Sequence, residues 1–332
     1  MSLPTVTRSW QFAVNQSFAM SGLAQTRAIL RALKNQLIGA GGLTWTDGSG
    51  ATITPAGAWT VVGSSDSSTA GLDGVDRWAA DSNLVWNAGG SAHSWIVLQQ
   101  AGISTTFQML IALDVSSGAG TSLSIVVSHN AFTGGSVTAN PTATGSNTVI
   151  GATTYGVGTA GTLRLHVMRS ADGQGTRIVF ATGGIVTGLW IFDKMGQVTS
   201  GVGQPYAAWA VGSTDGVTPA STAANHSTTA NCRGFGVSAL SSFMTCEGWG
   251  AGPSYAQVGG PSNFTAASPM LPIQLWSTTA SNRGRVGTLV DAWFGLSTNP
   301  TGTAYPDTGT TRQFVQHGVF ITPWNRTTPA MA

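Results

Sequence analysis

Residues 162–184 read TLRLHVMRSADGQGTRIVFATGG, and this stretch decides the fold class of the chain. Leu163, Leu165 and Val167 alternate with other residues, which is the period of a β-strand with one buried face. The Asp-Gly pair in the segment that follows is favoured in β-hairpin turns. We therefore predict two antiparallel strands, over 162–169 and 176–184. Met168 is placed on the outward face of the first strand.

Comparable short apolar or alternating runs lie on both sides of this hairpin, separated by Gly, Asn and Asp. Further strands are predicted at 93–100, 106–115, 122–129, 187–194, 271–277, 287–296 and 311–325. The predicted fold class is all-β, an antiparallel β-sandwich or jelly roll, with one N-terminal amphipathic α-helix. Residues 130–160 and 196–230 are rich in Gly, Thr, Ser and Ala, and are predicted to be long loops that cover a sheet or reach a partner.

The predicted helix covers residues 17–38 and ends at Gly39. Its apolar stripe consists of Met20, Leu23, Leu30, Leu33 and Leu37. Its basic residues are placed on the opposite side: Arg27, Arg31 and Lys34. The stripe has two interpretations, packing on a sheet of the same chain or docking on a neighbouring subunit. We divide the chain into an N-terminal arm and docking helix, 1–42, and a β domain with long loops, 43–332.

Charge is scarce throughout the chain. Only 14 Lys and Arg and 12 Asp and Glu occur among 332 residues, or 8%, whereas an average soluble domain has about 25%. The net charge is +2 and the basic residues are scattered, so the composition argues against a nucleic-acid-binding surface. Little net charge means little repulsion between copies, so we expect an assembly that contains several copies of the chain. No apolar run is long enough for membrane insertion.

The 12 tryptophans are either core residues or exposed contact residues. Four of them adjoin Asp, Asn, Gly or Pro and are predicted to be exposed: Trp78, Trp86, Trp249 and Trp324. Arg283 and Arg285 form a close basic pair that would contact an anion or the carboxylate of a partner, or lie in solvent. An exposed tryptophan beside Asn or Asp would also suit a carbohydrate-binding module.

Two sequence patterns suggest ligand binding but do not match their motifs fully. GVGTAG at 156–161 has the spacing of a dinucleotide-binding loop, yet it precedes a predicted strand and not a helix. The segment 72–86 holds the densest group of acidic residues, which are Asp73, Asp76 and Asp81. Oxygen ligands of this kind bind calcium, but the regular spacing of a calcium loop is missing. We predict no cofactor and no metal ion.

Glu247, beside Trp249, is the candidate acid for a polysaccharide hydrolase, a reaction that needs two carboxylates. No second carboxylate is paired with it in the sequence, so we predict no catalytic residue and no enzymatic activity. Cys232 and Cys246 are 14 residues apart and form either a disulfide or two buried thiols. Both alternatives stay open at this point.

Several segments together carry a family pattern: VDRWAADSNLVW (75–86), HSWIVLQQAG (93–102), LHVMRSADGQGTRIVF (165–180), GLWIFDK (188–194), NRGRVGTLVDAWFG (282–295) and RQFVQHGVFITPWN (312–325). The chain from about residue 57 onward resembles virion structural proteins of tailed bacteriophages. The resemblance implies a non-enzymatic tail, baseplate or head-associated component. Such a protein is assembled in the host cytoplasm, resides in the virion, and has other virion proteins and its own copies as partners.

Three alternatives remain beside this interpretation. The first is a host-attachment module that binds a glycan of the host surface. The second is a capsid decoration protein. The third, and the weakest, is a hydrolase acting on surface polysaccharide.

Overall fold

The computed structural model describes 10–19, 23–39, 45–46, 52–53, 59–66, 68–79, 93–100, 108–116, 120–128, 131–143, 149–156, 162–170, 175–182, 185–194, 197–198, 206–212, 232–235, 244–246, 270–277, 284–305 and 312–325. These residues form antiparallel sheets and one α-helix, so the all-β class with an N-terminal helix is confirmed. No helix among them is long and apolar enough to cross a membrane.

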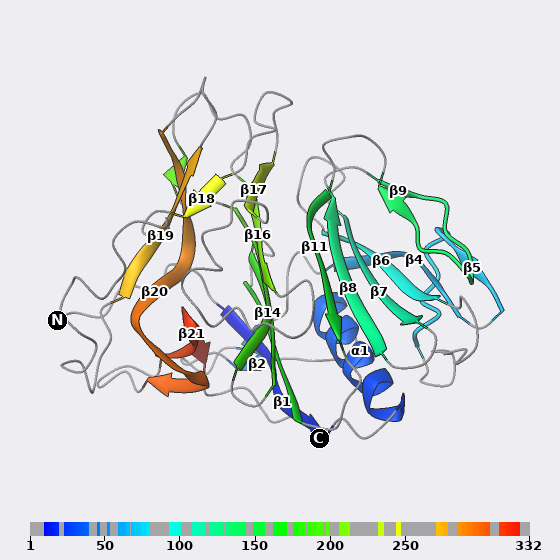
Figure 1. The fold of residues 1–332 in the computed structure, drawn as a ribbon, viewed down its shortest axis with the longest axis horizontal. Coiled ribbons are helices and arrows are strands. Elements are labelled where there is room, and N and C mark those ends of the chain that lie inside the picture. Colours follow the sequence, from blue (N-terminus) through cyan, green and yellow to red (C-terminus); the bar gives the residue numbers. More distant parts are fainter. Residues whose placement is uncertain are drawn as a thin grey trace.

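Three large sheets lie next to one another, and we name the middle one the central sheet (Figure 1). Its six strands, in spatial order, are β1 (Trp10–Ala19), β12 (Thr162–Ser170), β13 (Gly175–Thr182), β14 (Ile185–Lys194), β16 (Tyr206–Gly212) and β17 (Cys232–Phe235). The hairpin predicted from residues 162–184 is the β12–β13 pair, whose ladder joins His166 to Val179. The first strand, β1, pairs with β12, so residues 10–19 belong to the sheet and are not a separate arm.

The second sheet, on the right in Figure 1, is named the meander sheet. Its spatial order is β11 (Val149–Gly156), β8 (Gly120–Ser128), β7 (Gln108–Ser116), β6 (His93–Gln100), β4 (Trp59–Ser65) and β5 (Ala70–Gly71). From β4 to β11 each strand pairs with the next large strand along the chain. This order is a meander, which needs only hairpin connections between neighbours.

The third sheet, on the left in Figure 1, is named the C-terminal sheet. It contains β15 (Gln197–Val198), β20 (Gly284–Tyr305), β19 (Met270–Ser277), β18 (Met244–Cys246) and β21 (Arg312–Asn325), and β21 pairs with β20. Two small pairs complete the strands: β2 (Trp45–Thr46) with β3 (Thr52–Ile53), and β9 (Phe132–Thr133) with β10 (Thr142–Ala143).

The prediction of long loops over 130–160 and 196–230 was wrong for part of each segment. Strands β9, β10 and β11 lie in the first, and β15 and β16 lie in the second. Their Gly, Thr and Ala content hides the alternation that marks a strand, and pairing with a neighbouring strand supplies the backbone hydrogen bonds instead. The segment 130–160 was also predicted to cover a sheet. This is confirmed for Phe132, which packs against Trp95, Val97 and Leu110 of the meander sheet.

The helix of the described residues, α1 (Leu23–Ile38), begins six residues later than predicted, because residues 17–19 are the end of β1. Its end is as predicted, since Gly39 has φ 70°, the left-handed conformation in which helices commonly terminate. The helix contacts β1 and β12 of the central sheet and β4 of the meander sheet. It therefore packs between two sheets of its own chain.

Two hydrogen bonds show that the central sheet is covered on both faces. On one face, Trp59 of the meander sheet donates its indole Nε1–H to Thr176 Oγ1 at 3.1 Å. On the other, Thr322 of the C-terminal sheet donates its hydroxyl to Met168 Sδ at 3.6 Å. Neighbouring residues of a strand face opposite ways, and both Val167 and Met168 are 1% exposed. The prediction that Met168 faces outward was therefore wrong, because a second sheet covers that face.

Candidate functional site

The predicted docking stripe on α1 is part of the core of the chain. Leu30, Leu33 and Leu37 are at most 1% exposed. These three residues are thus not available to a neighbouring subunit, and the first of the two interpretations, packing on the chain's own sheets, is correct for them. Met20 lies outside the described residues, and the side chain of Leu23 is not among those described.

Trp78 was predicted to be exposed, and this prediction was wrong because its side chain is fully buried. Its indole Nε1–H donates to the Ser65 carbonyl oxygen at 3.2 Å, so the polar end of the ring is satisfied inside the protein. Among the other predicted contact residues, Trp86, Trp249 and Arg283 lie outside the described residues. Trp324 and Arg285 lie on β21 and β20, and their side chains are outside the description.

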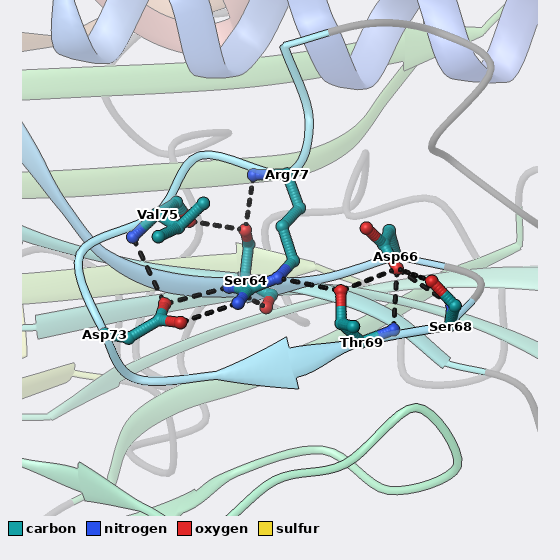
Figure 2. Close-up of polar contacts among 7 residues, drawn as sticks. All are labelled: Ser64, Asp66, Ser68, Thr69, Asp73, Val75 and Arg77. Carbon is teal, nitrogen blue, oxygen red and sulfur yellow. Dashed lines mark hydrogen bonds and ion pairs between the residues drawn. The ribbon is translucent and has the colours of Figure 1, made fainter.

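A dense polar cluster joins the end of β4 to the loop that follows β5, and we name it the Arg77 cluster. It consists of Ser64, Asp66, Ser68, Thr69, Asp73, Val75 and Arg77 (Figure 2). The Arg77 guanidinium donates to Asp73 through both terminal nitrogens, Nη1 to Oδ1 at 2.9 Å and Nη2 to Oδ2 at 2.6 Å. It also donates to the Ser64 carbonyl oxygen and to Thr69 Oγ1. One guanidinium therefore links the strand, the turn and the loop.

Asp66 organises the turn between β4 and β5. Its Oδ1 accepts hydrogen bonds from the backbone N–H and the hydroxyl of Ser68, at 2.8 and 3.2 Å, and from the same two groups of Thr69, at 2.7 and 3.1 Å. The Asp66 N–H donates to the Thr69 carbonyl oxygen. This is the local side-chain bonding for which aspartate is favoured in turns.

Ser64 fixes the loop from below, as Figure 2 shows. Its hydroxyl donates to the Val75 carbonyl oxygen at 2.8 Å and accepts the Arg77 N–H at 2.8 Å. The Gly74 N–H donates to the Val62 carbonyl oxygen at 2.8 Å, and the Val75 N–H donates to Asp73 Oδ1. The backbone of the loop tip is thus held in one conformation, with the Val75 side chain 48% exposed.

Lys34 connects this loop to the helix. Its Nζ lies 2.6 Å from Asp76 Oδ2 and donates to the Trp78 carbonyl oxygen at 3.2 Å. Lys34 was predicted to lie on the polar side of α1, and this was wrong because its side chain is 2% exposed. The sequence did contain the signal: Lys34 is four residues after Leu30 and three before Leu37, on the apolar stripe.

Hydrogen bonding changes the acidity of both carboxylates in the Arg77 cluster. The two hydrogen bonds from Arg77 hold the pKa of Asp73 well below its ordinary value. Asp73 in turn raises the pKa of Arg77. Partial burial opposes ionisation of Asp66, but the hydrogen bonds from Ser68 and Thr69 prevail, and its pKa is lowered. Both carboxylates are therefore stabilised as anions by donors of the chain itself.

This geometry disfavours the calcium interpretation of segment 72–86. Asp73 is paired with Arg77 and Asp76 with Lys34, so each carboxylate already has a cationic partner. Asp81 lies outside the described residues. No group of three or more His, Cys, Asp or Glu with metal-binding geometry is found in the described part of the chain.

The side chains that the structure describes expose few charges. Eight charged residues are among them: Arg31, Lys34, Asp66, Asp73, Asp76, Arg77, Arg177 and Asp291. Three are buried, four are half-buried, and Asp73 alone is exposed. The other exposed residues in this part of the chain are Thr, Ser, Gly, Ala and Val. The four tryptophans with described side chains, which are Trp59, Trp78, Trp95 and Trp293, are at most 5% exposed.

No protein-family model matches the chain, and no curated protein matches it at a significant level.

Proposed function

We propose that this chain is a non-enzymatic structural component of a tailed-phage virion. Several copies would contact one another and other virion proteins through surfaces of low charge. The tail, the baseplate and the particle surface are its proposed locations, and assembly would take place in the host cytoplasm. This proposal rests on the family resemblance of the sequence and on one structural observation.

That observation is the neutrality of the described surface. Thirteen of the fourteen exposed residues in the described part of the chain carry no charge, and the exception, Asp73, is neutralised by Arg77. Charged residues are depleted in the centre of protein interfaces, because burying a charge requires the loss of its hydration. A surface of Thr, Ser, Gly and Ala can be buried in an assembly at small desolvation cost.

The expected aromatic character of these interfaces receives no such support. All four tryptophans with described side chains are core residues. The glycan-binding alternative needs an accessible sugar-stacking tryptophan, and three of its candidates, Trp86, Trp249 and Trp324, lie outside the described side chains. In the described part of the chain, the residues that we propose for contacts between copies are therefore small and neutral.

We also propose that the layers form a β-sandwich. The central sheet contacts the meander sheet through β11 and β16, and the C-terminal sheet through β14 and β20. The meander order of β4 to β11 favours stacked meanders over a jelly roll, which requires crossing connections between sheets.

The location is tested by mass spectrometry of purified phage particles from a strain that expresses the gene. We expect the chain in the particles at a fixed ratio to the other virion proteins, and absence from particles would refute the proposal. Association is tested separately by light scattering of the purified chain over a range of concentrations. We expect oligomers whose population rises with concentration, whereas a monomer at every concentration would contradict contacts between copies.

A further inference from the structure

Cys232 and Cys246 lie at the ends of two short strands that contact each other. Cys232 is the first residue of β17, the last strand of the central sheet in spatial order. Cys246 is the last residue of β18, which occupies an edge of the C-terminal sheet. Strands β17 and β18 are in contact. The chain leaves β17 at Phe235 and enters β18 at Met244, so both cysteines are at the ends remote from this connection.

The strand register assigns Cys232 to one face of the central sheet. A continuous row of Cα partners runs through Cys232, Trp209, Ile191, Arg177 and Met168. Directly opposed residues in antiparallel strands share a face of the sheet. Met168, in the same row on β12, accepts the hydrogen bond from Thr322 of the C-terminal sheet. Cys232 is therefore on the face that meets the C-terminal sheet, the sheet that carries Cys246.

We propose that Cys232 and Cys246 form an intramolecular disulfide that links the central sheet to the C-terminal sheet. A disulfide requires Cα atoms about 4.4–6.8 Å apart, a separation that two contacting strands can provide. This bond would join two different sheets, unlike a disulfide that joins the two strands of one hairpin. The inference does not depend on the proposed virion function; in a protein assembled in the reducing host cytoplasm, the bond would form after release from the cell.

The bond would form by thiol–disulfide exchange with a small disulfide such as oxidised glutathione. One cysteine thiolate attacks a sulfur of glutathione disulfide, forms a mixed disulfide and releases one glutathione thiolate. The second cysteine thiolate then attacks the protein sulfur of the mixed disulfide and releases the second glutathione thiolate. The two protons of the cysteine thiols end on the two glutathione molecules, so two cysteines are oxidised and one glutathione disulfide is reduced.

The test uses the full chain, fully reduced and then incubated with glutathione disulfide. The product is denatured, alkylated with iodoacetamide and measured by intact-mass spectrometry. We expect a monomer whose mass is lower than that of the reduced chain by two hydrogen atoms, with no alkyl group added. Digestion without reductant should release the peptides of Cys232 and Cys246 joined. Two bound glutathiones, two alkyl groups or a disulfide-linked dimer would refute the proposal.

Thermal unfolding tests whether the disulfide between the two sheets stabilises the fold. The oxidised wild-type chain should unfold several degrees above the reduced chain, because the cross-link restricts the unfolded state. The matched control is the double variant Cys232→Ser, Cys246→Ser, whose unfolding temperature should be the same with and without reductant. Equal unfolding temperatures for the oxidised and reduced wild-type chain would refute a stabilising disulfide between the two sheets.

Discussion

Trp59 of the meander sheet and Thr176 of the central sheet are hydrogen-bonded across the interface between the two sheets. The distance from the indole Nε1 to Thr176 Oγ1 is 3.1 Å, and both residues are 1% exposed. The residues are 117 positions apart in the sequence. A buried hydrogen bond between two sheets defines how one sheet is positioned on the other, because a shift of either sheet would break the bond and leave a buried donor unpaired.

The first prediction concerns this bond. Trp59→Phe keeps an aromatic ring but removes the N–H, and should lower the free energy of unfolding by about 1–3 kcal/mol. Thr176→Val keeps the shape and removes the acceptor, and should cost a similar amount because the indole N–H is left unpaired. Urea unfolding of both single variants and the double variant measures the coupling. Fully additive effects would show that the two residues do not interact.

The second prediction concerns the pair of Lys34 and Asp76. Asp76→Asn leaves the buried ammonium of Lys34 without its carboxylate, and should cost about 3 kcal/mol, since an unpaired buried charge is strongly destabilising. Lys34→Met removes the buried charge and leaves Asp76, whose side chain is 27% exposed and can be hydrated. This variant should cost less, about 1 kcal/mol. Chemical denaturation compares the two, and a larger loss for Lys34→Met would contradict the prediction.

The third prediction concerns the pH dependence of Asp73. Its pKa is lowered in the folded state, so the ionised form is favoured by folding. The resulting stabilisation is complete above the ordinary aspartate pKa of about 3.9. It is lost only as the pH falls through the lower, folded-state value. NMR titration of the carboxyl carbons should detect ionised Asp73 well below pH 3.9.

Arg77→Met is the matched variant for this titration. It removes both hydrogen bonds to Asp73 and should return the Asp73 pKa towards its ordinary value. Asp66 provides the internal control, because its own pKa is lowered by Ser68 and Thr69, and it should move much less. High salt should also raise the Asp73 pKa in the wild-type chain, because the Asp73 carboxylate is exposed and its attraction to Arg77 is screened. An Asp73 pKa unchanged by Arg77→Met would refute the pairing.

The fourth prediction compares two glycines of the same region. A Cβ at Gly63 would meet the carbonyl oxygen of Gly71 and lie 2.5 Å from Leu72 Cα, both of which are backbone atoms. Gly63→Ala should therefore lower the free energy of unfolding by about 3 kcal/mol or more, because the backbone at Gly71 and Leu72 must move. Gly74 has φ 78° and open space around its Cβ position. Gly74→Ala should cost only about 1 kcal/mol, the penalty of a left-handed residue. Thermal unfolding ranks the two, and equal losses would contradict the close approach at Gly63.

Several elements could be predicted from the sequence because their apolar side chains recur with the spacing of a strand or a helix. Strand β6 has the predicted bounds, 93–100, and β12 and β21 differ from the prediction by one residue at one end. Gly39 ends the helix as predicted. Strand β16 could not be predicted from YAAWAVG, since alanine and glycine carry no strong preference. It forms because β14 and β17 offer backbone partners on both sides.

What the sequence by itself determined is therefore the all-β class, the helix and most of the long strands, together with a surface poor in charge. The tertiary structure alone decided which faces are buried. Trp78 beside Asp76, Lys34 on the helix and Met168 on its strand each look suited to the surface in the sequence, and each is covered by a distant segment. The reason is physical. The spacing of apolar side chains and the residues of a turn are local signals that act over a few positions. Burial and the ionic partner of a charged side chain depend instead on contacts between segments far apart in the chain.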